Sequence, residues 1–140
     1  MDIYAQNVLD RYKTPLHKDK SLPGRQAGIK PDISHREANH SCGDEAEVHL
    51  KLKGGKVQTY SWTGVGCAIS MASADMLDDL IANMPLKDVL KLTKKDIYDM
   101  LGIEISLRRS KCALLSLLAL QNGILLSQKK EKRSWVDYHI

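Results

Sequence analysis

Two stretches in the middle of the chain alternate apolar and polar residues with a period of two. In residues 46–53 the apolar positions are Ala46, Val48, Leu50 and Leu52. This alternation is typical of a strand with one buried face. Residues 56–63 read as a second strand, and Gly54-Gly55 between them suits a tight hairpin turn. The sequence therefore predicts an antiparallel hairpin, and a short strand over residues 32–37 completes a small sheet.

The rest of the chain carries helical periodicity. The predicted helices cover residues 2–13, 67–82, 94–100 and 110–120, with one or two turns over 86–92 and an extended connection over 14–31. Thr93 is the predicted N-cap of the third helix, which ends at Gly102. Ser110 is the predicted N-cap of the last helix, which we expect to stop at Asn122-Gly123. A helix, antiparallel strands and then more helices predict an α+β fold with the C-terminal helices packed on the sheet.

Length and composition suit one soluble domain. The chain has 140 residues, of which 43% are hydrophobic and 27% charged. We expect no apolar run to approach the roughly 20 residues of a membrane helix, and the first residues lack the features of a signal peptide. We therefore expect a cytoplasmic protein without a membrane partner. Residues 1–128 are predicted to form the domain and residues 129–140 a basic tail.

The net charge is +4, and much of the excess lies in Lys129, Lys130, Lys132 and Arg133. A basic tail can contact nucleic acid or an acidic partner. However, the chain has no aromatic-laced basic stripe and no nucleic-acid motif, which favours a solvated tail and no nucleic-acid partner. The last residues, 135–140, either dock onto a partner, pack on their own domain or stay disordered.

Three cysteines carry the candidate chemistry. An odd number in a cytoplasmic chain favours metal binding or thiol chemistry over a disulfide framework. Cys42 lies in a loop that leads into the hairpin, where Gly43 lets Cys42 and Asp44 project the same way. Cys67 begins a predicted helix. Cys112 lies in the first turn of another.

The surroundings of Cys112 include Arg108, Arg109 and Lys111. Cations and a helix N-terminus lower a thiol pKa, so the sequence predicts activated thiolates at Cys112 and at Cys67, which also begins a helix. The competing interpretation is that the cysteines are unrelated small apolar residues. It is reasonable for Cys112, evenly balanced for Cys67 and poor for Cys42, whose neighbours are polar.

Three segments resemble the cysteine motifs of the IscU/NifU N-terminal family, and most closely its SufU branch. They are Cys42-Gly43-Asp44, Gly64 to Ser73 and Lys111 to Leu115, and the similarity runs from about Tyr4 to Gly123. The resemblance implies a helix, three antiparallel strands and a group of helices. It also implies that Cys42, Asp44, Cys67 and Cys112 are ligands of zinc or of a transient iron–sulfur cluster. Three thiolates and one carboxylate suit both kinds of centre.

The resemblance further implies a role in iron–sulfur cluster assembly, as a sulfur carrier rather than a turnover enzyme. Cys42 would accept persulfide sulfur from a cysteine desulfurase, with Cys112 as a second reactive thiol. Sulfur or cluster would then pass to a downstream iron–sulfur carrier or apo-protein. Lys111 stands where the IscU branch has histidine, which favours the SufU branch. The stretch between Cys67 and Cys112, however, lacks the extra segment usual in SufU proteins.

Two other functions remain open at this stage. One is a structural zinc-binding adaptor without sulfur chemistry. The other is a cysteine hydrolase, which the histidines do not support with any local motif. His40 replaces the usual proline of the first motif and is either a spare ligand, a proton carrier or, as we favour, solvated. His17 and His49 are assigned no role.

Overall fold

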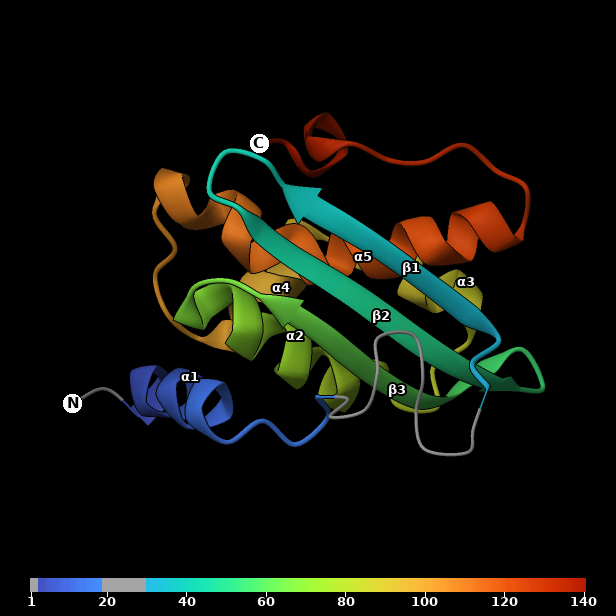
Figure 1. Cartoon of the computed structure of the whole chain (residues 1–140), viewed down its shortest axis with the longest axis horizontal. Helices are drawn as coiled ribbons and strands as arrows, with labels where there is room; N and C mark the ends of the chain where they lie inside the picture. Colours follow the sequence, from blue (N-terminus) through green and yellow to red (C-terminus); the bar gives the residue numbers. More distant parts are fainter. Residues whose placement is uncertain (1–2, 19–29) are drawn as a thin grey trace.

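A three-stranded antiparallel sheet runs through the middle of the protein, in the order β1-β2-β3 (Figure 1). The computed structural model describes residues 3–18 and 30–140, without the side chains of residues 3 and 4. Its elements are α1 (Ile3–Lys13), β1 (Ile33–Asn39), β2 (Asp44–Lys53), β3 (Lys56–Val65), α2 (Ala68–Ile81), α3 (Leu86–Val89), α4 (Lys94–Leu101), η1 (Leu107–Arg109), α5 (Ser110–Ser127) and η2 (Trp135–Tyr138). Most of the predicted connection 14–31 lies outside the described residues.

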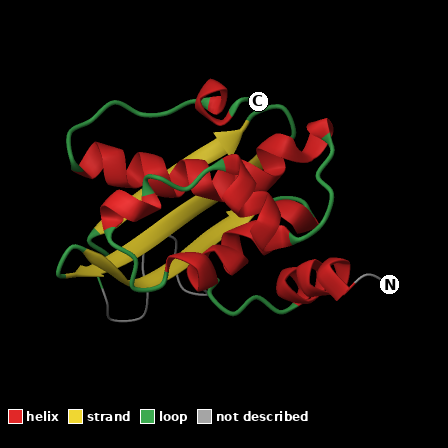
Figure 2. Ribbon diagram, turned by 180° about the vertical axis from the view of Figure 1, so that it is seen from behind, coloured by secondary structure: helices red, strands yellow, loops and turns green. Residues whose placement is uncertain are grey.

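The helices gather on one face of the sheet, as the view from behind shows (Figure 2). Helix α5 packs on β1 and β2, α2 packs on β3 and beside α5, and α1 lies against α2. The core between them contains Val48, Leu50 and Trp62 from the sheet and Leu117 and Leu120 from α5. The predicted α+β class, with C-terminal helices on a three-stranded sheet, is confirmed.

The strands form where the alternation predicts them. Val48 of β2 faces Trp62 of β3, and both are almost completely buried. Gly54 and Gly55 both have positive φ, as the predicted hairpin turn requires. Strand β1 extends two residues beyond its prediction, to Asn39, which pairs with Asp44 across the β1–β2 loop. This pairing fixes the base of the loop that contains Cys42.

Helix α4 confirms its predicted ends. Thr93 and Asp96 form a reciprocal capping box, and Gly102 closes the helix in the left-handed conformation. The predicted boundaries of α5 were wrong at both ends. Arg109 rather than Ser110 is the N-cap, so Ser110 is the first helical residue.

The predicted stop of α5 at Asn122-Gly123 was wrong because these residues serve packing rather than termination. The helix continues to Ser127. A Cβ at Gly123 would lie 3.0 Å from His35 Cβ and 3.1 Å from Ile33 Cγ2, so a glycine lets α5 approach β1 closely. The Asn122 side chain donates to Glu37 and accepts from the backbone N–H of Arg133.

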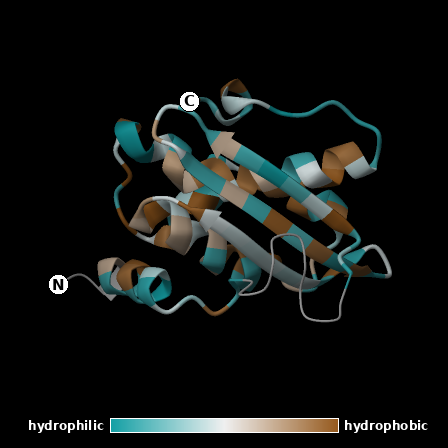
Figure 3. Cartoon of the chain, in the orientation of Figure 1, coloured by the Kyte–Doolittle hydropathy of each residue, from teal (hydrophilic) through white to brown (hydrophobic). Residues whose placement is uncertain are grey.

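The prediction that no apolar run approaches the length of a membrane helix also needs correction. Residues 107–127 are long and apolar enough to cross a membrane by length and composition alone. In the fold, however, 83% of their most apolar stretch is buried. Apolar residues dominate this helix (Figure 3) because it is the central helix of the core, in contact with both the sheet and α2.

The C-terminal tail follows its own domain and contacts it at several points, while Lys129, Lys130 and Lys132 stay exposed to solvent. Lys132 Nζ lies 3.0 Å from Glu37 Oε2, and the backbone N–H of Arg133 donates to Asn122 at 2.7 Å. Tyr138 is buried and donates its hydroxyl to Gln121. Figure 1 shows the result: the tail returns along α5 to the loop between β1 and β2. The domain boundary at residue 128 stays a prediction.

A buried carboxylate ties the N-terminal segment to the core. Asp75 of α2 is fully buried and accepts from Arg11 Nε at 2.7 Å and from Trp62 Nε1 at 3.0 Å. It also accepts from the backbone N–H groups of Leu16 and His17. Burial by itself would raise the pKa of Asp75, but these hydrogen bonds outweigh it and hold the pKa below its usual value.

We expect Asp75→Ala to lower the free energy of unfolding by about 3–5 kcal/mol at neutral pH, because it leaves Arg11 and several N–H groups without their acceptor. Since the native pKa is depressed, the stabilisation is complete above the unfolded pKa of about 3.9 and disappears as the pH falls through the native value. Urea unfolding at pH 7 and pH 3 measures this, and the difference from wild type should shrink at pH 3.

Asp79→Ala is the matched control. Asp79 accepts from the same Arg11 at 2.7 Å, but its side chain is 58% exposed. The substitution should therefore cost less than about 1 kcal/mol. Equal losses for the two variants would contradict the view that burial makes the Asp75 contact strong.

Candidate metal centre

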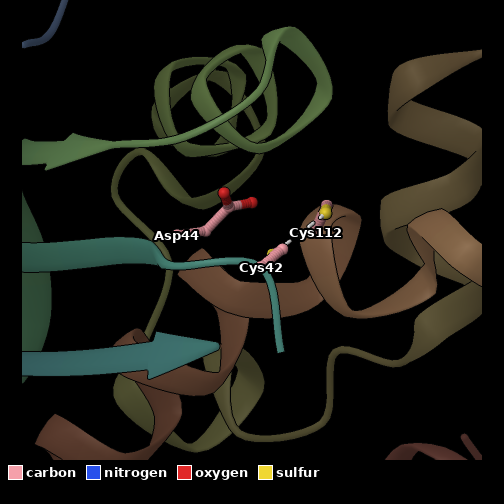
Figure 4. A group of neighbouring side chains, drawn as sticks. All are labelled: Cys42, Asp44 and Cys112. Atoms are coloured by element: carbon pink, nitrogen blue, oxygen red, sulfur yellow. Dashed lines mark hydrogen bonds between the residues drawn. The ribbon is translucent and has the colours of Figure 1, made fainter. Parts of the chain in front are cut away.

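Cys42, Asp44 and Cys112 converge at one end of the sheet (Figure 4). Cys42 lies in the β1–β2 loop and Asp44 begins β2. Cys112 lies in the first turn of α5. One ligand atom from each of these residues lies within 4.8 Å of the other two. The fold thus joins two motifs that are far apart in the sequence.

The loop around Cys42 is organised by Asn39. The backbone carbonyl of Asn39 accepts from the N–H of Gly43 at 2.9 Å, and Gly43 has a φ of +78° that favours glycine. The Asn39 side chain is buried and its amide Nδ2 donates to Cys42 Sγ at 3.1 Å. This contact holds the thiol toward the centre although Cys42 itself is exposed. This role of Asn39 was not visible in the sequence.

The spacing of the two sulfur atoms suits a tetrahedral ion. Cys42 Sγ and Cys112 Sγ are 3.9 Å apart, and neither cysteine is in a disulfide. Two sulfurs bound to one zinc ion at about 2.3 Å each, at the tetrahedral angle, are about 3.8 Å apart. The distance between the sulfurs is therefore already that of two ligands of one ion.

Asp44 supplies a buried carboxylate aimed at the same place. It is 5% exposed, and its Oδ2 atom has no hydrogen-bond partner among the described residues. Leaving such an atom unpaired is costly unless a cation or a proton compensates for it. Together with the sulfurs, this oxygen makes a donor set that fits zinc.

Cys67 lies beside this group, as the N-cap residue of α2. It is partly exposed and close enough to Cys112 to affect the ionisation of that thiol. The structure therefore brings all four predicted ligands to one end of the sheet. Three of them form the tight group, and Cys67 adjoins it.

The expected activation of Cys112 was wrong for the protein without metal. Burial raises the pKa of the Cys112 thiol, and the neighbouring Asp44 and Cys67 raise it further. Arg108 and Arg109 are exposed, so their charges are largely solvated. The thiolates of Cys112 and Cys67 and the carboxylate of Asp44 repel each other when all are ionised, and a bound dication would remove this penalty.

Gly66 makes room for the carboxylate. A Cβ at this position would lie 2.8 Å from Asp44 Cγ and 3.0 Å from Asp44 Oδ1. We expect Gly66→Ala to turn the Asp44 side chain away while leaving the fold intact, and to weaken zinc binding about 10–100-fold. Competition against a chelator of known affinity measures this, with circular dichroism as the check on folding.

Gly55→Ala is the control for adding a methyl group at a glycine. Gly55 lies in the β2–β3 turn, where a Cβ would meet nothing within 4 Å, although its positive φ adds strain. Zinc affinity should stay at the wild-type value in this variant. A similar loss of zinc in both variants would contradict a specific role for the space at Gly66.

A second group with metal-ligand chemistry lies at the other side of α2. His17 Nε2 is 3.3 Å from Asp78 Oδ2 and 3.6 Å from Asp79 Oδ1. Burial raises the pKa of Asp78, and the Asp79 and Asp75 charges add to this although His17 opposes it. Arg11 already donates to Asp79, so a cation occupies this surface. The group is a weaker candidate than the cysteine centre.

The geometry does not support a hydrolase. In the described part of the chain, the hydrogen bonds of Cys42 are with Asn39 and Cys112 rather than with a histidine. His40 is exposed in the loop, in keeping with a solvated side chain. A Cys–His pair needs the imidazole within hydrogen-bond reach of the thiol.

Comparison with known proteins places this arrangement in a family. Residues 3–134 match the family described as "NifU-like N terminal domain". The chain is 30% identical to the zinc-dependent sulfurtransferase SufU of Bacillus subtilis, covering 87% of this chain and 89% of that protein. It is 22% identical to the iron–sulfur cluster assembly scaffold protein IscU 1 of Archaeoglobus fulgidus, over 87% of this chain and 74% of that protein.

Other relatives are longer or share the fold alone. The nitrogen fixation protein NifU of Nostoc is 25% identical, and the match spans only 40% of that protein. A solved structure of a putative SUF-system scaffold protein from Fervidobacterium islandicum superposes with a TM-score of 0.69 at 21% identity, covering 87% of this chain and 96% of the other. This agreement shows that the fold is shared.

Proposed function

This chain belongs to the NifU-like N-terminal domain family, and from this premise we propose that it is an iron–sulfur cluster assembly protein. In this proposal it accepts persulfide sulfur at Cys42 from a cysteine desulfurase. It then serves as a cluster scaffold or as a zinc-dependent sulfur relay. The observation that carries the proposal is one exposed thiol, Cys42, only 3.9 Å from the buried thiol Cys112 and beside a buried carboxylate.

The four residues have different tasks in this proposal. Cys42 is the acceptor because it is exposed, whereas Cys112 is buried and Cys67 is partly exposed. The amide of Asn39 orients the Cys42 sulfur by donating to it. Cys112 and Cys67 are placed to receive the sulfur next or to complete the ligand set for a cluster, which is the cargo.

Zinc fits the donor set of Cys42, Asp44, Cys67 and Cys112. When bound, it would keep the thiols ionised and held together. The relative from Bacillus subtilis is named a zinc-dependent sulfurtransferase, which supports this assignment. The scaffold names of the other relatives support delivery of a cluster to a downstream carrier or apo-protein.

We place the protein in the cytoplasm. The proposed sulfur acceptance needs free thiols, and glutathione and thioredoxin keep thiols reduced in the cytoplasm. An oxidised Cys42 cannot take up a sulfur atom.

The decisive experiment measures metal and labile sulfide in protein purified without oxygen. Both are measured before and after incubation with a cysteine desulfurase, cysteine and ferrous iron. Zinc that persists at about one ion per chain while sulfur is transferred indicates a relay. Iron and sulfide acquired in matched amounts indicate a scaffold. Zinc without sulfur uptake in any condition would contradict the proposal and favour a structural zinc-binding adaptor.

A further inference from the structure

A buried serine hydroxyl without a partner lies in the first turn of α2, close to the metal centre. Ser70 is 2% exposed, and its Oγ atom has no hydrogen-bond partner among the described residues. A buried hydroxyl in this state is costly, because it has lost its hydrogen bonds to water. We infer that Ser70 is a positioning residue of the metal centre, whose hydroxyl donates a hydrogen bond to the Cys112 sulfur when that sulfur binds a metal ion. The inference rests on the proposed function and adds to it a residue outside the ligand set.

The helix places Ser70 on the face that carries Cys67. Ser70 follows Cys67 by three residues and precedes Ser73 by three, and residues at this spacing lie on one face of a helix. Cys67 lies close to Cys112, and the Ser73 hydroxyl donates to the Ala113 carbonyl at 2.7 Å. Ser70 therefore lies between two residues that both face the first turn of α5. Helix side chains tilt toward the N-terminus of their helix, so the Ser70 hydroxyl leans toward the end where the ligands gather.

The side chains around the Cys112 sulfur supply negative charge rather than hydrogen-bond donors. Cys112 is buried, so its sulfur has little access to water. Its neighbours at the centre are Cys42, Asp44 and Cys67, which are the other proposed ligands. Thiolates and carboxylates accept hydrogen bonds and do not donate them. A hydroxyl beside this sulfur would therefore be the donor that the ligand set lacks.

The exposed thiol of the centre has support of the same kind. Cys42 Sγ accepts from the amide of Asn39 at 3.1 Å, and Asn39 is itself buried. The two sulfurs that lie 3.9 Å apart would then each have a donor of their own, an amide from the β1–β2 loop and a hydroxyl from α2. Donors of this kind orient metal ligands and tune the properties of the metal or cluster.

The hydroxyl of Ser70 favours the metal-loaded protein over the metal-free one. A neutral thiol is a weak acceptor, whereas a metal-bound thiolate accepts a charge-assisted hydrogen bond. Ligand thiols lose their protons when the metal binds, so Ser70 gains a strong acceptor in that event. Asp44 Oδ2, which is also buried without a partner among the described residues, gains a cation at the same time. Metal binding thus satisfies two buried polar atoms at once.

Removal of the hydroxyl should change metal binding and metal-free stability in different directions. We expect Ser70→Ala to lower the zinc affinity of the full chain about tenfold, as for other residues that support a metal ligand. Without metal, the variant should unfold at the wild-type temperature or a few degrees higher, because it loses an unpaired buried hydroxyl and alanine favours a helix. Competition with a chelator measures the affinity, and thermal unfolding with excess chelator measures the stability.

Cobalt(II) bound in place of zinc reports on the sulfur itself. Thiolate ligands give cobalt a charge-transfer absorption, and a hydrogen bond that stabilises the sulfur electrons raises the energy of this band. We expect the band to move to longer wavelength in Ser70→Ala. It should return toward its wild-type position in Ser70→Thr, which keeps the hydroxyl. A purely structural change would weaken binding without this shift and without the rescue.

Two other buried serines provide matched controls. Ser61 of β3 is also buried without a partner among the described residues, but it pairs with His49 in the sheet, away from the centre. Ser61→Ala should leave the zinc affinity and the cobalt band unchanged. Ser73 lies on the same face of α2 as Ser70, but its hydroxyl already donates to Ala113. Ser73→Ala should lower the unfolding temperature and leave the band in place.

Wild-type zinc affinity and an unshifted cobalt band in Ser70→Ala would overturn the inference and leave the proposed function intact. A loss of affinity accompanied by a matching loss of metal-free stability would also overturn it, since this would indicate a role in packing alone. If the wild-type chain binds neither zinc nor cobalt through thiolates, the metal centre of the proposed function is contradicted, and the role of Ser70 with it.

Discussion

Cys42→Ala is expected to abolish sulfur acceptance, with at least about a hundredfold less persulfide per chain after incubation with a charged cysteine desulfurase. Cys42 is the exposed thiol of the centre, and Asn39 orients its sulfur. Cys112 is buried, and its raised pKa keeps it a thiol, the less reactive form, in the protein without metal. Mass spectrometry of the intact chain and of its peptides measures both the amount and the position of the added sulfur.

Cys67→Ala separates acceptance from general damage to the centre. Cys67 adjoins the group of three and is only partly exposed, so its loss should weaken metal binding but still permit sulfur to reach Cys42. Circular dichroism of both variants should match wild type, because neither residue belongs to the hydrophobic core. Undiminished sulfur uptake in Cys42→Ala, with the label on another cysteine, would refute the assignment of the acceptor.

Local patterns predicted most of the fold correctly because the residues that begin and end these elements lie within or next to them in the sequence. The alternation in β2 and β3, the paired glycines and the Thr93–Asp96 box all act through neighbouring residues. Asn122-Gly123 misled the prediction because the same residue types that stop a helix also permit close packing. Only the approach of Gly123 to His35 and Ile33 reveals which role applies.

For the candidate site, too, local motifs predicted the residues, whereas their environment depends on the fold. The motifs predict Cys42, Asp44, Cys67 and Cys112 as ligands, which stays a prediction, and the structure brings these residues to one end of the sheet, with Cys67 beside the tight group. The pKa of Cys112 was predicted to be lowered, but burial raises it. Neighbouring cations are visible in the sequence, whereas burial beside Asp44 is not.

The contributions of Asn39 and Gly66 depend on how the chain closes around the centre. Asn39 was visible within the first motif, but its hydrogen bond to the Cys42 sulfur depends on the conformation of the loop. Gly66 matters because Asp44 lies against it. Periodicity and spacing do not report such contacts, and only the presence of a glycine before Cys67 was visible in advance.

Cys112→Ala is expected to lower zinc affinity by about a thousandfold or more, because it removes a ligand that the fold holds in place. Cys112 Sγ lies 3.9 Å from Cys42 Sγ and beside Asp44, at the point where the group converges. The variant should fold normally without metal. Alanine favours the helix, and the substitution removes a buried thiol whose ionised form would be repelled by the Asp44 carboxylate. Competition with a chelator measures the affinity, and thermal unfolding without zinc measures the stability.

His17→Ala is the control for this result, because His17 belongs to the other group with metal-ligand chemistry in the described chain, with Asp78 and Asp79. Zinc affinity should be unchanged in that variant if the cysteine centre is the zinc site. Loss of zinc in His17→Ala together with retention in Cys112→Ala would place the metal on the wrong side of α2 for sulfur chemistry. The interpretation as a zinc-dependent relay would then fail. Sulfur acceptance at Cys42 without a metal is tested separately, by the persulfide content of Cys42→Ala.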